Sequence, residues 1–508
     1  MVMMFDNIPK ISSLLAGATV VFALGFVLLF PQWLRRAAFP PNAPKEVTEG
    51  SLFTGRLKFF SDRHKFYFQC KALSRSGNFS QYLGNHQVVG LSGLDGRRTF
   101  YEAKEMDVEE GYNLFFVTNP SLRGPAKLPI NIPSYRFQTD LIRAMRTENL
   151  KKRLPFMLRS TAASINRLID HAVPVRVIDP FEELDLVGYH SLMHLIGLDE
   201  VTESKELPRK TLSLFHQVEK SDSPLHVIFP FLPTPAFVRR VTAIMRLYKA
   251  FRTVVHKRQR TLSRKDDIIQ SLMDKGQSSY NIVIFIIATL FGGQANTPVM
   301  TAWLLIHLAS NPEWMDRVRT EVDSSLVRHS TGQETPQLVL SRLDLEIWEY
   351  EFPSIDLCLR ESIRLHFLGS VYRRNCGDKG IPIGETGEVI PRGAFAFLLV
   401  DDVHFNPAIY PDPNKWDPGR YLADRAEDKK VPLGFVGWGA GRNPCLGMRY
   451  AKLSVTIMVA LFISLFDFTL CDEQGNPMAH PPQPDRKEQN DARPKTPARL
   501  KCTVRKSV

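Results

Sequence analysis

A lone cysteine inside a glycine-rich segment near the C-terminal end constrains this chain more than any other feature. The segment from Gly434 to Lys452 reads GFVGWGAGRNPCLGMRYAK, and Cys445 is its single cysteine. Because glycine has no Cβ, such a loop lets the backbone approach something large and flat. Helix-forming residues follow from Met448, and the free N–H groups and dipole of a helix N-terminus stabilise a thiolate. A thiolate held in this way suits the axial position of a haem iron. The alternative is a buried structural cysteine beside a glycine turn.

Four positions of this segment carry a family resemblance. These positions are Trp438, Gly441, Cys445 and Gly447. Together they resemble the cysteine-loop signature of the cytochrome P-450 family, the haem-thiolate monooxygenases. The resemblance implies a mainly α fold with small β-sheets, preceded by one N-terminal transmembrane helix. It also implies a haem (iron protoporphyrin IX) whose iron Cys445 ligates, and electrons that come from NADPH through a cytochrome reductase, with cytochrome b5 as an optional donor.

The loop departs from the commonest form of the signature at two positions. Trp438 replaces a phenylalanine, and Asn443 stands where a basic residue usually precedes the cysteine by two, with Arg442 one step earlier. This form is similar to the branch that holds sterol 7α- and 12α-hydroxylases and prostacyclin synthase. An asparagine can donate to a haem propionate but brings no charge. Arg374 resembles the family's arginine on the strand beside the haem. The expected cofactor-binding residues are therefore Cys445, Asn443, Arg442, Trp438, Gly439 and Arg374.

A second motif pairs Glu361 with Arg364 on one face of a helix predicted over 356–367. An ordinary surface ion pair is the alternative and is common. The stretch DPGRY at 417–421 follows at the distance that the family requires. The resemblance therefore implies that Arg420 joins Glu361 and Arg364 in a buried charge triad. The triad is expected to brace the cysteine loop and to be structural rather than catalytic.

A long helix is predicted over 279–310, apolar nearly all round and therefore buried. The stretch GGQANTP at 292–298 interrupts it, and Pro298 has no N–H to donate to the carbonyl of Gln294. Most family members carry an acid followed by a threonine here, whereas this chain has Ala295 and Asn296. We expect the opened helix to leave carbonyls free to hold a water that Asn296 orients with support from Thr297. The alternative is that Asn296 and Thr297 only satisfy the broken helix hydrogen bonds.

The N-terminal part of the chain predicts a membrane anchor. Residues 11–30 carry no charge and would span about 30 Å as a helix, which is the thickness of a bilayer core. The basic Arg35, Arg36 and Lys45 follow, so the bulk of the chain is expected on the cytoplasmic side. The predicted organisation is a membrane anchor (1–30), a basic and proline-rich hinge (31–50) and a haem-thiolate catalytic domain (51–508). We expect a single-pass protein of the endoplasmic reticulum membrane.

Other segments carry weaker expectations. The β-rich pieces at 66–69 and 87–89 suggest a small sheet region, and residues 498–506 alternate as a terminal strand would. The apolar, proline-rich stretch from Leu225 to Phe237 suggests membrane or ligand contact, with a buried loop as an equal alternative. The polar segment 472–497 predicts disorder.

Charge and cysteine usage narrow the class of partner. The formal net charge is +12, which suits an acidic electron donor or an anionic membrane face. No nucleic-acid-binding module is present, so we expect no nucleic-acid partner. The six cysteines show no paired spacing, which fits free thiols in a reducing compartment.

The sequence thus favours a membrane-bound haem-thiolate monooxygenase that uses O₂ to oxidise an apolar sterol-, terpenoid- or lipid-like small molecule, with a role in secondary metabolism. The alternative is a haem-thiolate isomerase or dehydratase that acts on a peroxide without O₂ or a reductase. A third hypothesis is a non-enzymatic haem sensor or carrier.

Overall fold

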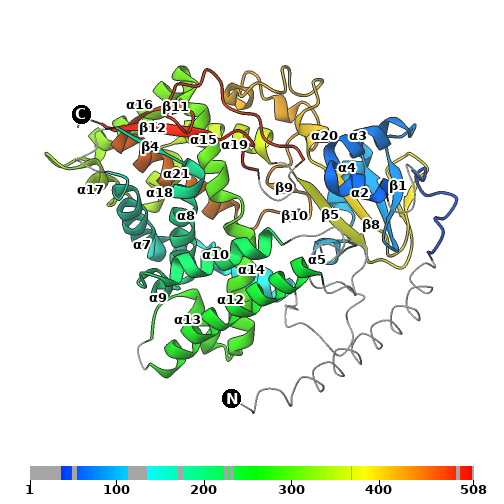
Figure 1. The fold of residues 1–508 in the computed structure, drawn as a ribbon, viewed down its shortest axis with the longest axis horizontal. Coiled ribbons are helices and arrows are strands. Elements are labelled where there is room, and N and C mark those ends of the chain that lie inside the picture. Colours follow the sequence, from blue (N-terminus) through cyan, green and yellow to red (C-terminus); the bar gives the residue numbers. More distant parts are fainter. Residues whose placement is uncertain are drawn as a thin grey trace, which may run out of the picture.

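The computed structural model describes residues 36–47, 54–112, 134–169, 175–221, 227, 234–261, 264–367, 369–487 and 492–505. Helices dominate it, and the largest sheet lies at one side of the domain (Figure 1). The predicted fold, mainly α with small β-sheets, is confirmed. The predicted transmembrane segment 11–30 lies outside the described residues, as does most of the stretch from Leu225 to Phe237.

The helices cover most of the described chain. They are α2 (Thr54–Ser61), α3 (Arg63–Ala72), α4 (Gly93–Glu102), α5 (Val108–Tyr112), α6 (Ser134–Ala144), α7 (Thr147–Asn166), α8 (Pro180–Ile196), α9 (Asp199–Thr202), α10 (Leu207–Glu219), α12 (Pro235–Arg260), α13 (Ile268–Asp274), α14 (Ser279–Gly293), α15 (Thr297–Ala309), α16 (Pro312–His329), α17 (Pro336–Leu340), α18 (Leu345–Tyr350), α19 (Pro353–His366), α20 (Asp401–His404) and α21 (Met448–Leu465), with 3-10 turns η2 (Pro418–Tyr421) and η3 (Glu427–Lys429).

The strands form one larger sheet and three small ones. The five-stranded sheet has the order β1 (Phe79–Leu83), β2 (His86–Leu91), β8 (Phe395–Leu399), β5 (Ser370–Asn375), β3 (Met106–Asp107). Only its β2–β8 pair is parallel. The others are β11 (Phe466–Cys471), β12 (Arg499–Val504) and β4 (Val175–Ile178); β9 (Gly439–Ala440) with β10 (Asn443–Pro444); and β6 (Ile381–Pro382) with β7 (Val389–Ile390).

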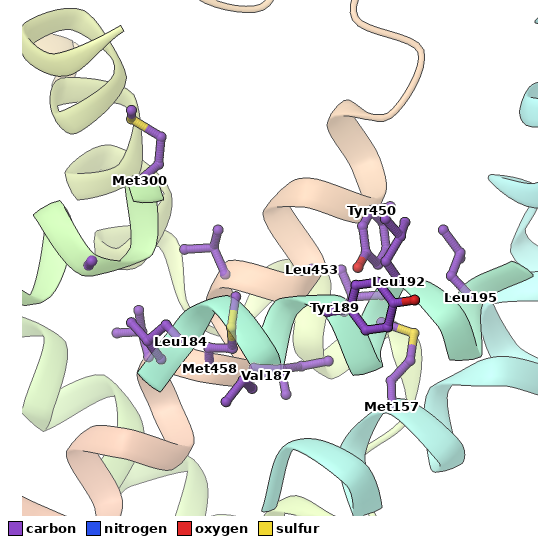
Figure 2. Packing of buried hydrophobic residues seen from close by; sticks show 14 of the residues in the cluster. Met157, Leu184, Val187, Tyr189, Leu192, Leu195, Met300, Tyr450, Leu453 and Met458 are labelled. Carbon is purple, nitrogen blue, oxygen red and sulfur yellow. The ribbon is translucent and has the colours of Figure 1, made fainter. Parts of the chain in front are cut away.

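The core is built around helices that are apolar on most faces. By length and apolarity, two helical stretches of the described chain could cross a membrane, Ser279–Ala309 and Met448–Leu465, but most of each is buried inside the domain. Figure 2 shows Leu453 and Met458 of α21 beside Leu184, Val187 and Leu192 of α8. Fully burying one such side chain stabilises a fold by roughly 1.5–3 kcal/mol, so these helices form a rigid frame for the site.

Two local predictions are corrected here. Residues 66–69 are helical in α3 rather than extended, because Asp62 caps that helix by accepting from the Lys65 N–H at 3.0 Å. The polar tail is described over 472–487 and 492–497, and there it packs on the domain: Arg486 pairs with Asp401 at 2.6 Å, and the Ala492 carbonyl accepts from Trp303 at 2.7 Å. The strand predicted after residue 498 is confirmed as β12, between β11 and β4.

Candidate haem-thiolate site

The cysteine loop is a tight hairpin that leads directly into α21. Strands β9 and β10 pair antiparallel, and the Cys445 N–H donates to the Trp438 carbonyl at 2.7 Å. Gly441 has φ +57°, and a Cβ there would stand 2.4 Å from the carbonyl oxygen of Tyr101. Only glycine therefore allows the loop to press against α4. Cys445 itself is exposed, one of two such cysteines with Cys376.

The protonation state of Cys445 depends on what the sulfur binds. Although the residue is partly open to the cavity, the protein around the sulfur desolvates it and raises the pKa of this thiol above its usual value, while the N–H groups of Gly447 and Met448 oppose the shift. The N–H groups at the helix start favour the thiolate, and coordination to a metal ion would deprotonate the thiol outright.

A cavity of about 690 Å³ lies between the cysteine loop and the long helix. Five of the predicted cofactor-binding residues line it, namely Cys445, Asn443, Arg442, Trp438 and Gly439. Asn296 and Thr297 line it as well, so the structure brings the two predicted groups to one space. Most of the remaining lining is apolar, for example Phe137, Leu141, Ile244, Ile284 and Ile287.

Two buried arginines beside this cavity make no direct ion pair with an acid of the described residues. Arg373, 4% exposed, lines it, while Arg97, 5% exposed, shares a face of α4 with the cavity residue Tyr101. Among the described residues no carboxylate lies within 4 Å of either guanidinium, and neither Nε has a hydrogen-bond partner. Burial lowers the pKa of both side chains; Asp402 opposes this most at Arg97, and Tyr112 does so at Arg373. Buried charges are normally paired.

These observations test the fit of a haem. The group is flat, carries two carboxylates and takes a thiolate as axial ligand. The glycine hairpin, the two arginines without a direct ion pair among the described residues and the cavity-facing Cys445 supply the matching features. The residues present therefore fit the cofactor that the sequence predicts.

The prediction for Arg374 needs correction. Its Nη1 pairs with Glu110 at 3.0 Å and its Nε donates to the Gly393 carbonyl at 3.1 Å, so it faces away from the cavity. Successive side chains on a strand point to opposite faces. Arg373, its neighbour on β5, lines the cavity in its place.

The predicted charge triad forms and is buried. Arg364 donates through Nε and Nη2 to the two Glu361 oxygens at 2.8 Å each, and the Arg420 Nε lies 3.2 Å from Glu361 Oε1. These three side chains are at most 1% exposed. Tyr421 donates to Glu361 at 3.0 Å and Glu427 accepts from Arg420 at 2.8 Å. The last two residues were not found from the sequence.

A hydrogen-bonded chain joins the triad to the cysteine loop. Arg364 Nη1 donates to the His404 carbonyl at 2.7 Å, and His404 Nε2 accepts from the Val436 N–H at 3.1 Å. Burial lowers the pKa of His404 well below its usual value, so the ring is neutral and can accept. Tyr410 adds a bond to the Gly434 carbonyl at 2.9 Å. The start of the loop is thus tied to the triad.

The long helix breaks where the sequence predicts. α14 ends at Gly293 and α15 begins at Thr297, with a turn over 294–296 between them. Within the described chain the amides of Ala295 and Asn296 donate to no carbonyl, and the Asn296 side chain makes no capping bond. The part of the alternative that has Asn296 cap the broken helix is therefore not seen. Its role in orienting a water stays a prediction.

Fold and site together define a haem-thiolate protein, and comparison with known proteins gives its family. The sequence profile described as Cytochrome P-450 matches residues 48–490. The chain is 33% identical over 477 residues to the cytochrome P-450 monooxygenase AacuE of Aspergillus aculeatus, covering 90% of this chain and 93% of that one. This protein therefore belongs to the cytochrome P-450 family.

Further relatives agree. The cytochrome P-450 monooxygenase nsrP of Aspergillus novofumigatus is 32% identical, covering 91% of this chain and 89% of that one. The structure of retinoic acid-bound cyanobacterial CYP120A1 superposes with a TM-score of 0.69 at 20% identity, over 91% of this chain and 99% of that one, which supports the fold. The protein is a cytochrome P-450 monooxygenase, and these relatives lend no support to the isomerase alternative.

Proposed function

We propose that this enzyme uses O₂ and electrons from an NADPH-dependent reductase to hydroxylate or otherwise oxidise an apolar sterol-, terpenoid- or lipid-like small molecule. The observation that carries this proposal is the cavity of about 690 Å³, with Cys445 on one side and Asn296 and Thr297 on the other. The haem and the substrate would share this space. The mostly apolar walls suit a substrate with few polar groups.

The residues of the cysteine side would hold the cofactor. Cys445 would ligate the iron, and the loop residues Trp438, Gly439 and Asn443 would pack against the ring. Arg373 would neutralise a propionate, with Arg442 and Arg97 as further cations nearby. When bound, the haem supplies the activation of O₂. The triad of Glu361, Arg364 and Arg420 would keep the loop in place and take no part in the chemistry.

The residues of the helix side would handle water and protons. The Asn296 amide can donate and accept, so either end can orient a water in the cavity. Thr297 supplies a hydroxyl one position later. Because the Asn296 side chain makes no cap hydrogen bond, it remains available to such a water. Apolar walls exclude other water, which strengthens each of these polar contacts.

Membrane attachment through residues 1–30, with a hinge over 31–50, also belongs to the proposal, as do reductase docking and a role in secondary metabolism. The uncharged run 11–30 and the net charge of +12 support the first two. The anchor is tested by expressing the chain from residue 40. We expect this variant to bind haem while it loses most of its membrane attachment; loss of all haem would contradict the division.

The central test follows the oxygen atom. The purified chain, with candidate apolar substrates, is assayed under ¹⁸O₂ with and without NADPH and reductase. We expect one labelled oxygen in the product, and only when both NADPH and reductase are present. An unlabelled product formed without them would contradict the proposal.

A further inference from the structure

One face of α8 supports the break in the long helix, with only its last residue, Leu192, reaching the cavity. Asp185, Gly188 and Leu192 lie on this face at i, i+3 and i+7. We call these three residues the α8 cradle. A Cβ on Gly188 would stand 2.5 Å from Cγ of Pro298, so the proline ring occupies the place of a side chain. A Cβ on Gly293 would likewise stand 3.0 Å from Leu192.

The polar contact of the α8 cradle is made to Gln294. The Gln294 Nε2 donates to both the carbonyl oxygen and Oδ1 of Asp185, at 2.8 Å each. Gln294 is 2% exposed and does not line the cavity, and its Oε1 has no partner within the described chain. An unpaired buried amide is unfavourable, so the two bonds fix the direction of this side chain.

Asp185 is itself held by α10. Its Oδ2 lies 2.6 Å from Nε2 of His216, whose Nδ1 lies 3.0 Å from Glu219. Burial disfavours the charged ring, but the two carboxylates outweigh burial and raise the pKa of His216 to about 9. At neutral pH His216 is therefore protonated and donates to both acids. A continuous chain runs from Gln294 through Asp185 and His216 to Glu219.

The turn needs such an external support. The Ala295 and Asn296 amides make no backbone bond within the described residues, so the helix ladder does not fix the turn. We propose that Gln294, held by Asp185 and His216, is a positioning residue that sets where the turn presents Asn296 and Thr297 to the cavity. This inference rests on the proposed role of Asn296 and Thr297, and it deepens that role.

The test uses carbon monoxide bound to the reduced holoenzyme, because the C–O stretching band reports polar groups near the ligand without substrate or reductase. Gln294→Met removes both bonds and keeps the side-chain length. We expect it to shift or split the band, as Asn296→Leu does, with haem content unchanged. Peroxide released per NADPH consumed, measured with reductase, should rise several-fold in both variants.

A matched control is available in α13. Gln270 donates its Nε2 to Asp274 Oδ1 at 3.0 Å, which is the same pairing at an exposed place. Gln270→Met should leave the band and the peroxide yield unchanged. Asp185→Leu removes the carboxylate acceptor but leaves the backbone carbonyl, so it should shift the band in the same direction as Gln294→Met and by less. The double variant should be no worse than Gln294→Met alone, because that substitution already removes both bonds.

The outcomes separate this inference from the proposed function. A wild-type band in Gln294→Met with a shifted band in Asn296→Leu overturns the positioning role alone. Wild-type bands in both overturn the role of Asn296 and the inference with it. Additive effects of Gln294→Met and Asp185→Leu would show that the two residues act independently. The contact between them would then not be what positions the turn. If Gln294→Met fails to hold haem, Gln294→Leu, which also removes both bonds, decides in its place, and a wild-type band there overturns the inference.

Discussion

The two sides of the cavity are built in opposite ways. On the cysteine side the hairpin, the triad and the His404 link satisfy backbone and side-chain groups through many short bonds. On the helix side the turn at 294–296 leaves two amides without a backbone bond and Asn296 without a capping bond within the described chain. The comparison suggests that one side fixes a bound group, whereas the other keeps polar atoms available for water. Substitutions on the cysteine side should therefore cause loss of haem, whereas substitutions on the helix side should keep haem and lose coupling.

Glu361→Ala should give the largest effect on the cysteine side. It leaves Arg364 and Arg420 buried without the acid they share, and breaking such a buried pair destabilises a protein by about 3–5 kcal/mol. We expect protein that fails to hold haem, measured by haem content and thermal unfolding. The control is Glu313→Ala, which removes an exposed i,i+4 pair with Arg317 and should matter by about 0.5 kcal/mol or less. A stable holoprotein with only its turnover altered would contradict the structural role of Glu361.

Arg373→Ala should weaken haem retention next most strongly. Loss of a charge-assisted hydrogen bond, about 1.5–3 kcal/mol, corresponds to tenfold or more in haem dissociation. Arg374→Ala is the matched control on the same strand, because that side chain pairs with Glu110 instead. Transfer of haem to an apo-acceptor protein measures both rates. Faster loss from Arg374→Ala than from Arg373→Ala would reverse the assignment.

On the helix side, Asn296→Leu and Thr297→Val should keep haem and stability but lose coupling. We expect product formed per NADPH consumed to fall several-fold, because the water that they orient is lost. General acid–base assistance of this kind typically contributes about 10²–10⁴-fold in rate. A several-fold fall in coupling therefore corresponds to losing only part of that assistance. Wild-type coupling in both folded variants would remove this stretch from proton delivery.

A smaller effect on the same side concerns pH. The pKa of His216 is raised in the folded state, so its contribution to stability is fully present below its ordinary value of 6.5 and is lost as pH rises through about 9. At 1.36 kcal/mol per pKa unit this contribution is about 3 kcal/mol at most. The thermal unfolding temperature of the wild type should therefore fall between pH 7 and 9.5, and that of His216→Gln should fall less. If the unfolding temperatures of the two proteins change with pH in parallel, His216 is not charged in the folded state.

What could be predicted from the sequence was local chemistry with fixed spacing. The cysteine loop, the Glu361 and Arg364 pair and the break at Pro298 each rest on residues close together in the chain, and the structure shows the expected geometry. Arg373 was missed because a one-residue choice on a strand decides which side chain faces the cavity. The strand expected at 66–69 is a helix because Asp62 caps it, which the alternation of residue types does not show.

Contacts between distant segments were beyond such reasoning. The bonds of Asp185 to Gln294 and of His404 to Val436 join helices or loops that the chain brings together only in the folded state. Arg97 belongs to no sequence motif. It stands out only because it is buried without a direct ion pair among the described residues, and that depends on the fold. The fixed cysteine side was therefore largely predictable, whereas the supports of the helix side were not.

The most direct measurement is the absorption spectrum of the reduced CO complex in Cys445→Ala, compared with Cys376→Ala. Both cysteines are exposed, but only Cys445 lines the cavity. The wild type and Cys376→Ala should show the red-shifted Soret band of thiolate ligation, and Cys445→Ala should lack it. A red-shifted band that persists in Cys445→Ala would contradict the assignment of this side of the cavity as the haem-thiolate site.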